Sequence, residues 1–518
     1  MVPMHTVQAI EVGVGPVSFD ELVQVARHGA PVALTADALS AIDRAREVVE
    51  TLAAAETPTY GVSTGFGALA TRHIPTEMRA QLQRSLVRSH AAGSGPEVER
   101  EVVRGLMLLR LSTLATGHTG VRRETAQLLA GLLSHGITPV VREYGSLGCS
   151  GDLAPLSHCA LALMGEGDVR DAGGTLMPAA DALAAAGLAP VELVAKEGLA
   201  LINGTDGMLG MLVMAITDLR MLLRTADVAA AMSVEGQFGT DRVFAPELQA
   251  IRPHPGQALS AANLTALMAD SAIVASHRTG DCNRVQDAYS LRCSPQVHGG
   301  ARDTVEHAAT VAGRELASAI DNPVVLGDRV ESNGNFHGAP VAYVLDFLAI
   351  VAADVASISE RRTDRFLDRA RSHDLPPFLA SDPGVDSGHM IAQYTQAAIV
   401  SELKRLAVPA SVDSIPSSAM QEDHVSMGWN AARKLRTAVD GLSRVVAIEV
   451  LTAARALDLR APLTPSPATC AVVALLRRSG IEGPGPDRHL SPEIETAVSL
   501  VHSGAVVDAV EEVIGALR

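Results

Sequence analysis

Aromatic residues and clustered cysteines are both scarce in this sequence. Phe, Trp and Tyr make up 3% of the 518 residues, whereas Ala and Leu are abundant, a balance that favours helices over a β-rich core. The cysteines are odd in number and widely spaced, with no Cys-x-x-Cys pair, so neither a disulfide framework nor a zinc knuckle is indicated. Reduced thiols in the cytoplasm are expected for these five positions: Cys149, Cys159, Cys282, Cys293 and Cys470.

Positive charge and long apolar runs are also lacking. The chain has 42 Lys and Arg against 58 Asp and Glu, a net charge of -16, which argues against nucleic acid or an anionic membrane as the main partner. Residues 1–20 contain no basic start followed by an apolar run, and the apolar stretch around 208–216 ends too early to span a bilayer. These absences favour a cytoplasmic enzyme that acts on a small molecule.

The apolar pattern predicts a mainly α fold. With 47% hydrophobic residues, the chain can bury the cores of two or more structural units. Apolar positions recur with spacings of three and four over 341–355 and 435–457, which predicts long helices that pack into a bundle. Ser491-Pro492-Glu493 predicts the start of a last helix that ends near Arg518. The predicted architecture is a long up-down helical bundle body with a smaller mixed N-terminal region.

Strand signals and composition place the boundary between these two parts. Strands are predicted only at 138–141 and in a hairpin in which 323–326 and 329–332 flank Gly327-Asp328. The segment 165–189 is rich in Gly, Ala and Pro, so we expect an N-terminal region over 1–190 and a helical body over 191–518.

The segment GSLGCSGDLAPLSH at 145–158 contains a triplet that could react with itself. In Cys149-Ser150-Gly151, the glycine nitrogen can approach the carbonyl of the residue two before it. Cyclisation with loss of water, including the Ser150 hydroxyl, would leave an electrophilic methylidene on a five-membered ring. No ordinary side chain is a good electrophile, so such a group would define the chemistry. Taken alone, the segment is equally an ordinary loop that ends at Ser150 or Asp152 as a helix cap.

Three further segments have both a functional and an ordinary interpretation. YGVSTGFG at 60–67 fits a lid over a ligand or a surface turn, and its dinucleotide-like glycines lack a preceding strand and a following acid. Ser89-His90 follows a helical run, where a histidine is more often a core or cap residue than a ligand contact. Asn203-Gly204-Thr205 fits a simple turn.

The segment 286–292 places a phenol and a guanidinium three residues apart, on one side of a helical turn. Arg292 could clamp a carboxylate and Tyr289 could act as a base, although a buried tyrosine beside a surface ion pair explains the pattern equally well. Gln421-Glu422-Asp423-His424 suggests a metal site, but no His-x-x-x-His pair or cysteine cluster completes one, so we expect no metal.

Nine segments in this order resemble the family of aromatic amino acid ammonia-lyases and aminomutases, from about Tyr60 to Ala454. No single segment would suffice, but the ordered set is specific. The segments are YGVSTGFG at 60–67, LVRSHAAG at 86–93, GSLGCSGDLAPLSH at 145–158, KEGLALINGT at 196–205, RPHPGQ at 252–257, VQDAYSLRC at 285–293, DNPVV at 321–325, SNGNFHG at 332–338 and QEDHVSMG at 421–428.

The resemblance implies a prosthetic group, a set of catalytic residues and an assembly. Cys149, Ser150 and Gly151 would cyclise autocatalytically to a 4-methylidene-imidazol-5-one, and no metal or nucleotide would be needed. The assembly implied is a homotetramer whose active sites draw residues from more than one subunit. The other roles carried over are Tyr289 as the base, Arg292 as the carboxylate clamp, Asn203 and Gln286 as hydrogen-bonding groups, Phe336 beside the ring and Tyr60 as a catalytic residue on the mobile loop.

Two positions bear on the substrate. Phenylalanine and tyrosine lyases of the family tend to carry Phe-Leu or His-Leu where this chain has Ser89-His90, and Gln where it has Glu422. A carboxylate and a histidine that bind the polar edge of an imidazole would be left unpaired by a phenyl ring, at a cost of roughly 1 to 3 kcal/mol. The expected reaction is conversion of L-histidine to trans-urocanate and ammonia, the first step of histidine degradation. The alternative is an aminomutase, or a lyase for another aromatic amino acid.

Overall fold

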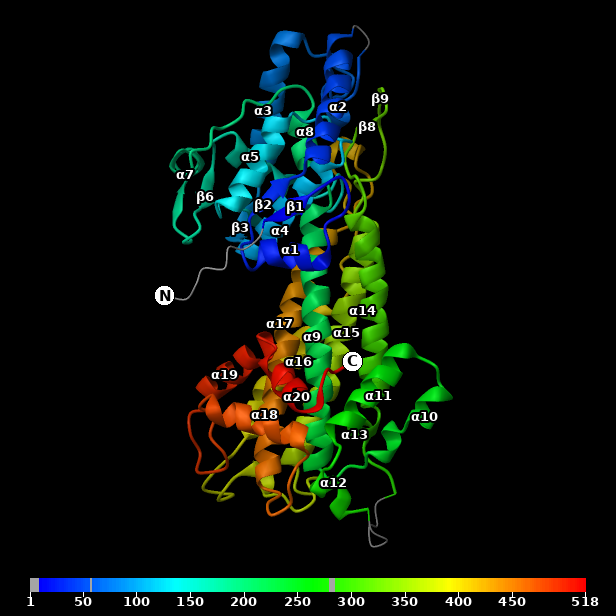
Figure 1. The fold of residues 1–518 in the computed structure, drawn as a ribbon, viewed down its shortest axis with the longest axis vertical. Helices are drawn as coiled ribbons and strands as arrows, with labels where there is room; N and C mark the ends of the chain where they lie inside the picture. Colours follow the sequence, from blue (N-terminus) through cyan, green and yellow to red (C-terminus); the bar gives the residue numbers. More distant parts are fainter. Residues whose placement is uncertain (1–8, 56–57, 279–284) are drawn as a thin grey trace. The chain divides into compact units, whose positions relative to one another are not determined.

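The computed structural model describes residues 9–55, 58–278 and 285–518, which form 20 α-helices and nine short strands (Figure 1). The chain divides into two compact units. Unit 1 comprises Met1–Met214, Ala309–Leu345 and Pro409–Arg433, and unit 2 comprises Ala215–Ala308, Asp346–Val408 and Lys434–Arg518. Residue 190 lies inside the first segment of unit 1, and the domain boundary expected there stays a prediction.

Unit 1 contains all nine strands of the described residues, arranged in four small sheets. The strands are β1 (Ile10–Val12) with β2 (Val32–Leu34), β3 (Ser94–Glu97) with β5 (Arg142–Tyr144), β4 (Thr138–Pro139) with β6 (Asp168–Arg170) and β7 (Leu176–Pro178), and β8 (Val324–Leu326) with β9 (Arg329–Glu331). The helices wholly inside this unit are α1 (Phe19–Ala26), α2 (Ala36–Ala54), α3 (Arg79–His90), α4 (Arg100–Ala115), α5 (Arg123–Ser134), α6 (Leu153–Leu163), α7 (Ala179–Ala185) and α8 (Glu197–Ile202).

The core of unit 1 is built around α4, in which every residue from Val102 to Ala115 is buried. Because this helix is buried on all sides, its polar side chains must find partners in the interior. Its two buried arginines donate hydrogen bonds to oxygen atoms of the protein. Arg104 donates to the carbonyls of Val25 and Leu133, at 2.9 and 3.0 Å. Arg110 donates to the Asn203 backbone carbonyl at 3.3 Å, and so connects the core to the segment that contains Asn203.

Four long helices cross the division between the units in sequence: α9 (Asp206–Gly236), α14 (Ser294–Leu316), α15 (Ala339–Leu367) and α17 (Gly428–Asp458). The α-helices wholly inside unit 2 are α10 (Pro246–Ala250), α11 (Pro255–Leu267), α12 (Ala272–Ser276), α13 (Tyr289–Arg292), α16 (Met390–Leu406), α18 (Pro467–Arg478), α19 (Ser491–His502) and α20 (Ala505–Ile514). The predicted mainly α fold with a helical bundle body is therefore confirmed, and the strands of the described residues lie in unit 1.

A buried carboxylate joins three of the long helices within unit 2. Glu449 of α17 accepts hydrogen bonds from Ser233 of α9 at 2.7 Å and from Ser359 of α15 at 2.6 Å. Arg362 donates to the same carboxylate through Nη2 at 2.8 Å, and both ionic side chains are fully buried. The charge of Glu449 is thus compensated on both oxygens.

Replacing Glu449 with Gln should lower the stability of unit 2 by about 3 kcal/mol, because the Arg362 guanidinium would stay buried without a counter-charge. The matched control is Glu306→Gln, which removes the exposed ion pair between Arg220 and Glu306 and should cost about 1 kcal/mol or less. Thermal melting of the purified variants checks this. Equal melting temperatures for the two variants would contradict it.

The expected long helices and hairpin are present, while the last helix is not continuous. α15 and α17 contain the apolar patterns at 341–355 and 435–457, and β8 and β9 form the expected hairpin. The prediction of one helix from Ser491 to near Arg518 was wrong, because the chain breaks at Gly504, which adopts φ 80°. Helix α20 then packs against α18.

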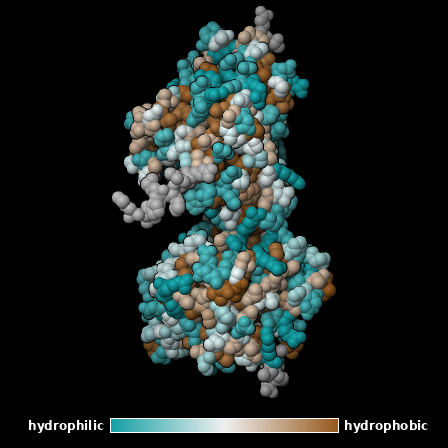
Figure 2. Space-filling model, in the orientation of Figure 1, coloured by the Kyte–Doolittle hydropathy of each residue, from teal (hydrophilic) through white to brown (hydrophobic). Residues whose placement is uncertain are grey.

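Helix α15 is long and apolar enough to cross a membrane by length and composition alone. However, 61% of its apolar stretch is buried inside the protein, as in the core helix of a soluble protein. On the face drawn in Figure 2, hydrophilic and hydrophobic residues are interspersed.

Candidate active site

The Cys149-Ser150-Gly151 triplet lies in a tight turn of unit 1. Gly148, Ser150 and Gly151 have φ of 70°, 51° and 74°, the left-handed region that glycine enters without strain and serine rarely does. Gly151 forms a bridge with Gly204, and a Cβ on Gly151 would lie 2.0 Å from the Gly204 carbonyl oxygen. Only glycine fits at the third position of the triplet. A turn this tight fits the closure of a five-membered ring across the triplet.

Asp152 fixes this turn against the start of α9. Its backbone N–H donates to the Gly204 carbonyl at 2.7 Å, and its carboxylate accepts from the N–H groups of Gly207 and Met208, both at 2.9 Å. The other carboxylate oxygen accepts from the Ser146 hydroxyl at 2.8 Å. Burial raises the pKa of the Asp152 carboxyl to about 7, while these N–H and hydroxyl donors lower it. The carboxylate therefore caps α9 and not α6, the helix that follows it in sequence.

Glu422 lies against the triplet. One oxygen of its carboxylate lies 3.4 Å from the Cys149 Sγ, and the other lies 3.4 Å from the Ser150 Oγ. The Ser417 hydroxyl also donates to this carboxylate, at 3.2 Å. Backbone hydrogen bonds between Ser417 and Glu422 close the loop that carries the acid. The sequence-predicted specificity acid and the sequence-predicted reactive triplet thus form one cluster.

His90, at the end of α3, is held as a neutral ring. Burial lowers the pKa of His90, against the hydrogen bond to the Leu86 carbonyl and the negative charge of Glu422. The ring Nδ1 lies 2.9 Å from that carbonyl, which can only accept, so Nδ1 carries the proton and Nε2 is an acceptor. Ser89 lies beside the same nitrogen at 3.0 Å and therefore orients His90.

Asn203 lies next to Gly204 and is nearly fully buried. Its amide nitrogen donates to the Asn322 carbonyl at 3.0 Å, and its backbone carbonyl accepts from Arg110 at 3.3 Å. Its side-chain oxygen Oδ1 has no protein partner among the described residues. A buried amide oxygen without a partner is costly, and it fits a site that a further polar group completes.

Tyr60 begins a loop that reaches the Glu422 segment. The Tyr60 hydroxyl accepts from the Gly67 N–H at 3.3 Å, and a Cβ on Gly67 would lie 3.5 Å from the Ser418 Oγ. The loop therefore packs beside the turn that carries Glu422.

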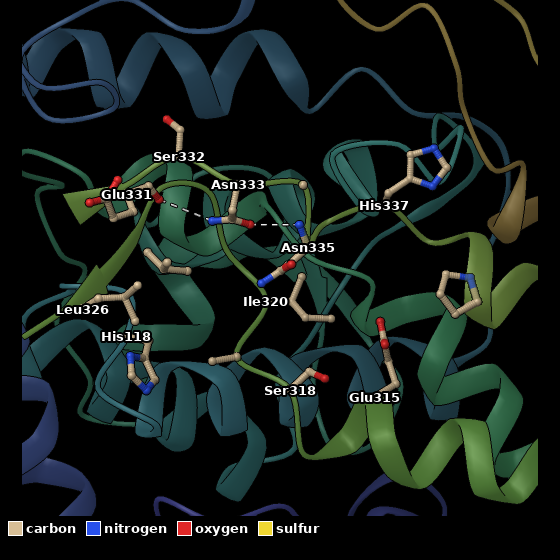
Figure 3. Close-up of a pocket in the computed structure, with 14 residues that line it drawn as sticks. His118, Glu315, Ser318, Ile320, Leu326, Glu331, Ser332, Asn333, Asn335 and His337 are labelled. Carbon is tan, nitrogen blue, oxygen red and sulfur yellow. Dashed lines mark hydrogen bonds between the residues drawn. The ribbon is translucent and has the colours of Figure 1, made fainter.

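Phe336 lies in the segment 332–338, which lines a cavity of about 830 Å³ in unit 1. Figure 3 shows Asn333 between Glu331 and Asn335, with the Asn335 N–H donating to the Asn333 side chain at 2.9 Å. The next residues lead to the triplet, since the Gly338 N–H donates to the Gly148 carbonyl at 3.1 Å. Phe336 itself is half-buried and is not among the residues that line the cavity.

Gln286, Tyr289 and Arg292 form a second group, in unit 2. Arg292 donates to the Gln286 side chain at 2.8 Å, and its guanidinium carbon lies 4.7 Å from the centre of the Tyr289 ring. Tyr289 is 71% exposed. The Arg292 Nε is buried and has no protein partner in the part of the chain that the structure describes. This arrangement leaves the exposed Tyr289 phenol able to meet a ligand, while the Arg292 Nε lacks a hydrogen-bond acceptor among the described residues.

The cysteines and acids give no sign of a disulfide or metal site in the described ranges. Cys149, Cys159, Cys293 and Cys470 are free thiols, and Cys282 lies outside the described residues. No group of three His, Cys, Asp or Glu side chains that could hold a metal occurs in residues 9–55, 58–278 and 285–518.

Sequence reasoning missed two contributors to this cluster, Ser417 and Asp152. Ser417 precedes the quoted segment 421–428, and its role depends on a turn in which Ser418, Ala419 and Met420 all have positive φ, from 51° to 68°. No residue in that turn signals such a backbone.

Asp152 follows the triplet directly, and only the distant contact with α9 reveals what it binds.

Comparisons with known proteins agree on one family. The family model described as aromatic amino acid lyase matches residues 17–478. The chain is 68% identical over 517 residues to a histidine ammonia-lyase of Streptomyces griseus, covering 99% of this chain and 100% of that relative. It is also similar to a solved histidine ammonia-lyase of Trypanosoma cruzi, with a TM-score of 0.89 and 38% identity over 98% of this chain and 95% of that one. The chain is also similar to a solved tyrosine aminomutase of Streptomyces globisporus, with a TM-score of 0.93 and 37% identity over 99% of this chain and 100% of that one.

Proposed function

The chain belongs to the aromatic amino acid lyase family, and from that premise we propose that it converts L-histidine to trans-urocanate and ammonia without oxidation. It is a carbon–nitrogen lyase of the ammonia-lyase class. The observation that carries the choice of substrate is the position of Glu422, within 3.4 Å of Cys149 and Ser150. A carboxylate at this point can accept a hydrogen bond from an imidazole N–H, which a phenyl ring cannot supply.

The prosthetic group proposed is a 4-methylidene-imidazol-5-one, which Cys149-Ser150-Gly151 would form. The Gly151 nitrogen bonds to the Cys149 carbonyl carbon, and two waters leave, one with the carbonyl oxygen and one with the Ser150 hydroxyl. When present, this group supplies an electrophile that makes the amine a better leaving group. The positive φ at Ser150 and Gly151 and the unpartnered Oδ1 of Asn203 support it.

The other residues bind and orient the substrate. The Arg292 guanidinium pairs with the substrate carboxylate, with Gln286 holding the guanidinium in place. The Tyr289 phenol removes the β-proton, and the amine leaves as ammonia. His90 and Glu422 receive the imidazole, Asn203 hydrogen-bonds beside the ring, Phe336 packs near it, and the loop that begins at Tyr60 covers the site and excludes water.

We also propose a cytoplasmic homotetramer whose active sites combine residues of different subunits. Helix α15 carries Tyr343, Phe347 and Ile350 at spacings of four and three, each exposed by 46% or more. Such an apolar stripe fits contact with another copy of the chain. Light scattering after size exclusion tests this, and an active monomer would contradict it.

A Glu422→Gln variant should turn over L-histidine with kcat/KM lowered about tenfold to a hundredfold, because the imidazole N–H loses a charged acceptor. Ammonia release and the ultraviolet absorbance of urocanate measure this. Asp423→Asn is the matched control, since Asp423 is an exposed neighbour, and it should leave turnover unchanged.

The same assay separates the alternatives. Unchanged histidine turnover by Glu422→Gln would show that the acid is only structural. Preference of the unaltered protein for phenylalanine or tyrosine would contradict the substrate proposed, and a β-amino acid product in place of urocanate would identify an aminomutase.

A further inference from the structure

The two oxygens of the Glu422 carboxylate have different partners. Oε2 lies 3.4 Å from the Cys149 Sγ and 3.2 Å from the Ser417 Oγ, whereas Oε1 lies 3.4 Å from the Ser150 Oγ. All four groups belong to unit 1. The carboxylate is therefore held on one side by a thiol and a hydroxyl that the ring chemistry leaves intact.

The Cys149 thiol is suited to donate to this carboxylate. Its side chain is buried in an apolar cluster with Val425 and Met427, against which Leu147 packs. Burial, followed by the negative charge of Glu422, raises the pKa of the Cys149 thiol to about 12. The thiol consequently stays protonated at neutral pH, and its S–H points a partial positive charge at Oε2.

The backbone of Ser417 is fixed independently of the thiol, although its hydroxyl also hydrogen-bonds to Cys149. Its N–H donates to the Glu422 carbonyl at 2.9 Å, and the Glu422 N–H donates back to the Ser417 carbonyl at 3.3 Å. These two bonds hold Ser418 to Met420 between them in the left-handed region, which non-glycine residues enter only where the surrounding structure imposes it. The Ser417 hydroxyl therefore approaches Oε2 from the loop that also carries the acid.

Of the three side-chain donors around the carboxylate, cyclisation of the triplet removes only the one at Oε1. The Ser150 hydroxyl leaves as water, so Oε1 loses its donor. The Cys149 thiol and the Ser417 hydroxyl remain and still donate to Oε2. We propose that Cys149 and Ser417 are positioning residues that hold Glu422 by Oε2, so that the vacated Oε1 faces the imidazole of the substrate. This inference rests on the proposed function. The inference gives the Cys149 side chain a role that is separate from ring formation, in which only the backbone of this residue takes part.

Deleting the thiol should weaken recognition of the imidazole without preventing ring formation. In Cys149→Ala, loss of two waters should persist by intact mass, because only the backbone carbonyl of this residue reacts. KM for L-histidine should rise about threefold to tenfold, with a smaller change in kcat, because the thiol supports only one charge-assisted contact. Cys149→Ser supplies a hydroxyl donor and should restore KM to within about twofold.

Binding measured without turnover gives a second readout. Calorimetry with imidazolepropionate and 3-phenylpropanoate compares two ligands that differ in the ring and lack the amine. The preference for imidazolepropionate should fall about threefold or more in Cys149→Ala and in Ser417→Ala. Cys159→Ala is the matched control, since Cys159 is an equally buried thiol on α6, and it should leave the preference unchanged.

The outcomes separate the two proposals. The positioning role would be overturned if the ligand preference is unchanged in both Cys149→Ala and Ser417→Ala. If Cys149→Ala fails to form the ring, an unchanged preference in Ser417→Ala would overturn it. An unaltered protein that shows no loss of two waters, or does not turn over L-histidine, would instead overturn the proposed function.

Discussion

Ser150→Ala is expected to lower the rate of urocanate formation by about a thousandfold or more, because it removes the atom whose loss creates the electrophile. The alternative interpretation, an ordinary loop with a helix-capping serine, predicts a modest loss of stability and nearly normal turnover. The two interpretations therefore differ by orders of magnitude in one assay.

The structure indicates that this variant should fold. The Ser150 hydroxyl contacts the Glu422 carboxylate at 3.4 Å, and alanine removes only that oxygen. The turn around Gly151 is held by the backbone of Gly204 and by Asp152, which the substitution leaves in place. A loss of activity would therefore report on chemistry, provided that the melting temperature stays near that of the unaltered protein.

Intact mass supplies the direct measurement. The unaltered chain should be lighter than its sequence by two water molecules, and Ser150→Ala should not show that deficit. Ser157→Ala is the control from the same segment, because the Ser157 hydroxyl donates only to the Leu153 carbonyl of its own helix at 2.7 Å. It should keep both the mass deficit and the activity. Turnover retained by Ser150→Ala would remove the basis for the proposed prosthetic group.

The sequence predicted those elements whose cause is local. The apolar repeats gave α15 and α17, and the turn at Gly327-Asp328 gave the hairpin of β8 and β9, because periodicity and turn chemistry act over a few residues. The break at Gly504 was missed, since an isolated glycine inside a helical pattern can be tolerated and does not by itself mark the end of a helix.

Contacts between distant segments could not be predicted from local pattern. Asp152 reads as the cap of the helix that follows it, yet its carboxylate binds the N–H groups that begin α9, more than fifty residues away in sequence. The pairing of Cys149 with Glu422 joins residues separated by 273 positions. Such pairings depend on how the chain folds back on itself, which neither composition nor spacing encodes.

Tyr289→Phe is expected to lower kcat by about a hundredfold to ten-thousandfold with little change in KM, because it removes the proposed base and leaves the carboxylate clamp in place. A phenylalanine ring can keep the contact with the Arg292 guanidinium, which lies 4.7 Å from the ring centre. Gln286 can still hold Arg292, since their hydrogen bond does not involve the phenol. The variant thus deletes one hydroxyl from an exposed side chain.

The mass deficit distinguishes this loss from that of Ser150→Ala. The triplet belongs to unit 1 and Tyr289 to unit 2, so Tyr289→Phe should still lose two waters while turning over slowly. Tyr394→Phe is the matched control, because Tyr394 is an exposed tyrosine of α16 in the same unit, and it should retain full activity.

Full activity of Tyr289→Phe would assign β-proton removal to another group, with Tyr60 the next candidate among the tyrosines. A rise in KM without a fall in kcat would give Tyr289 a binding role alone, because a base acts only as the proton is transferred. A fall in kcat alone, with the mass deficit intact, would place proton removal and ring formation on different residues of the chain. The electrophile and the base can then be altered one at a time.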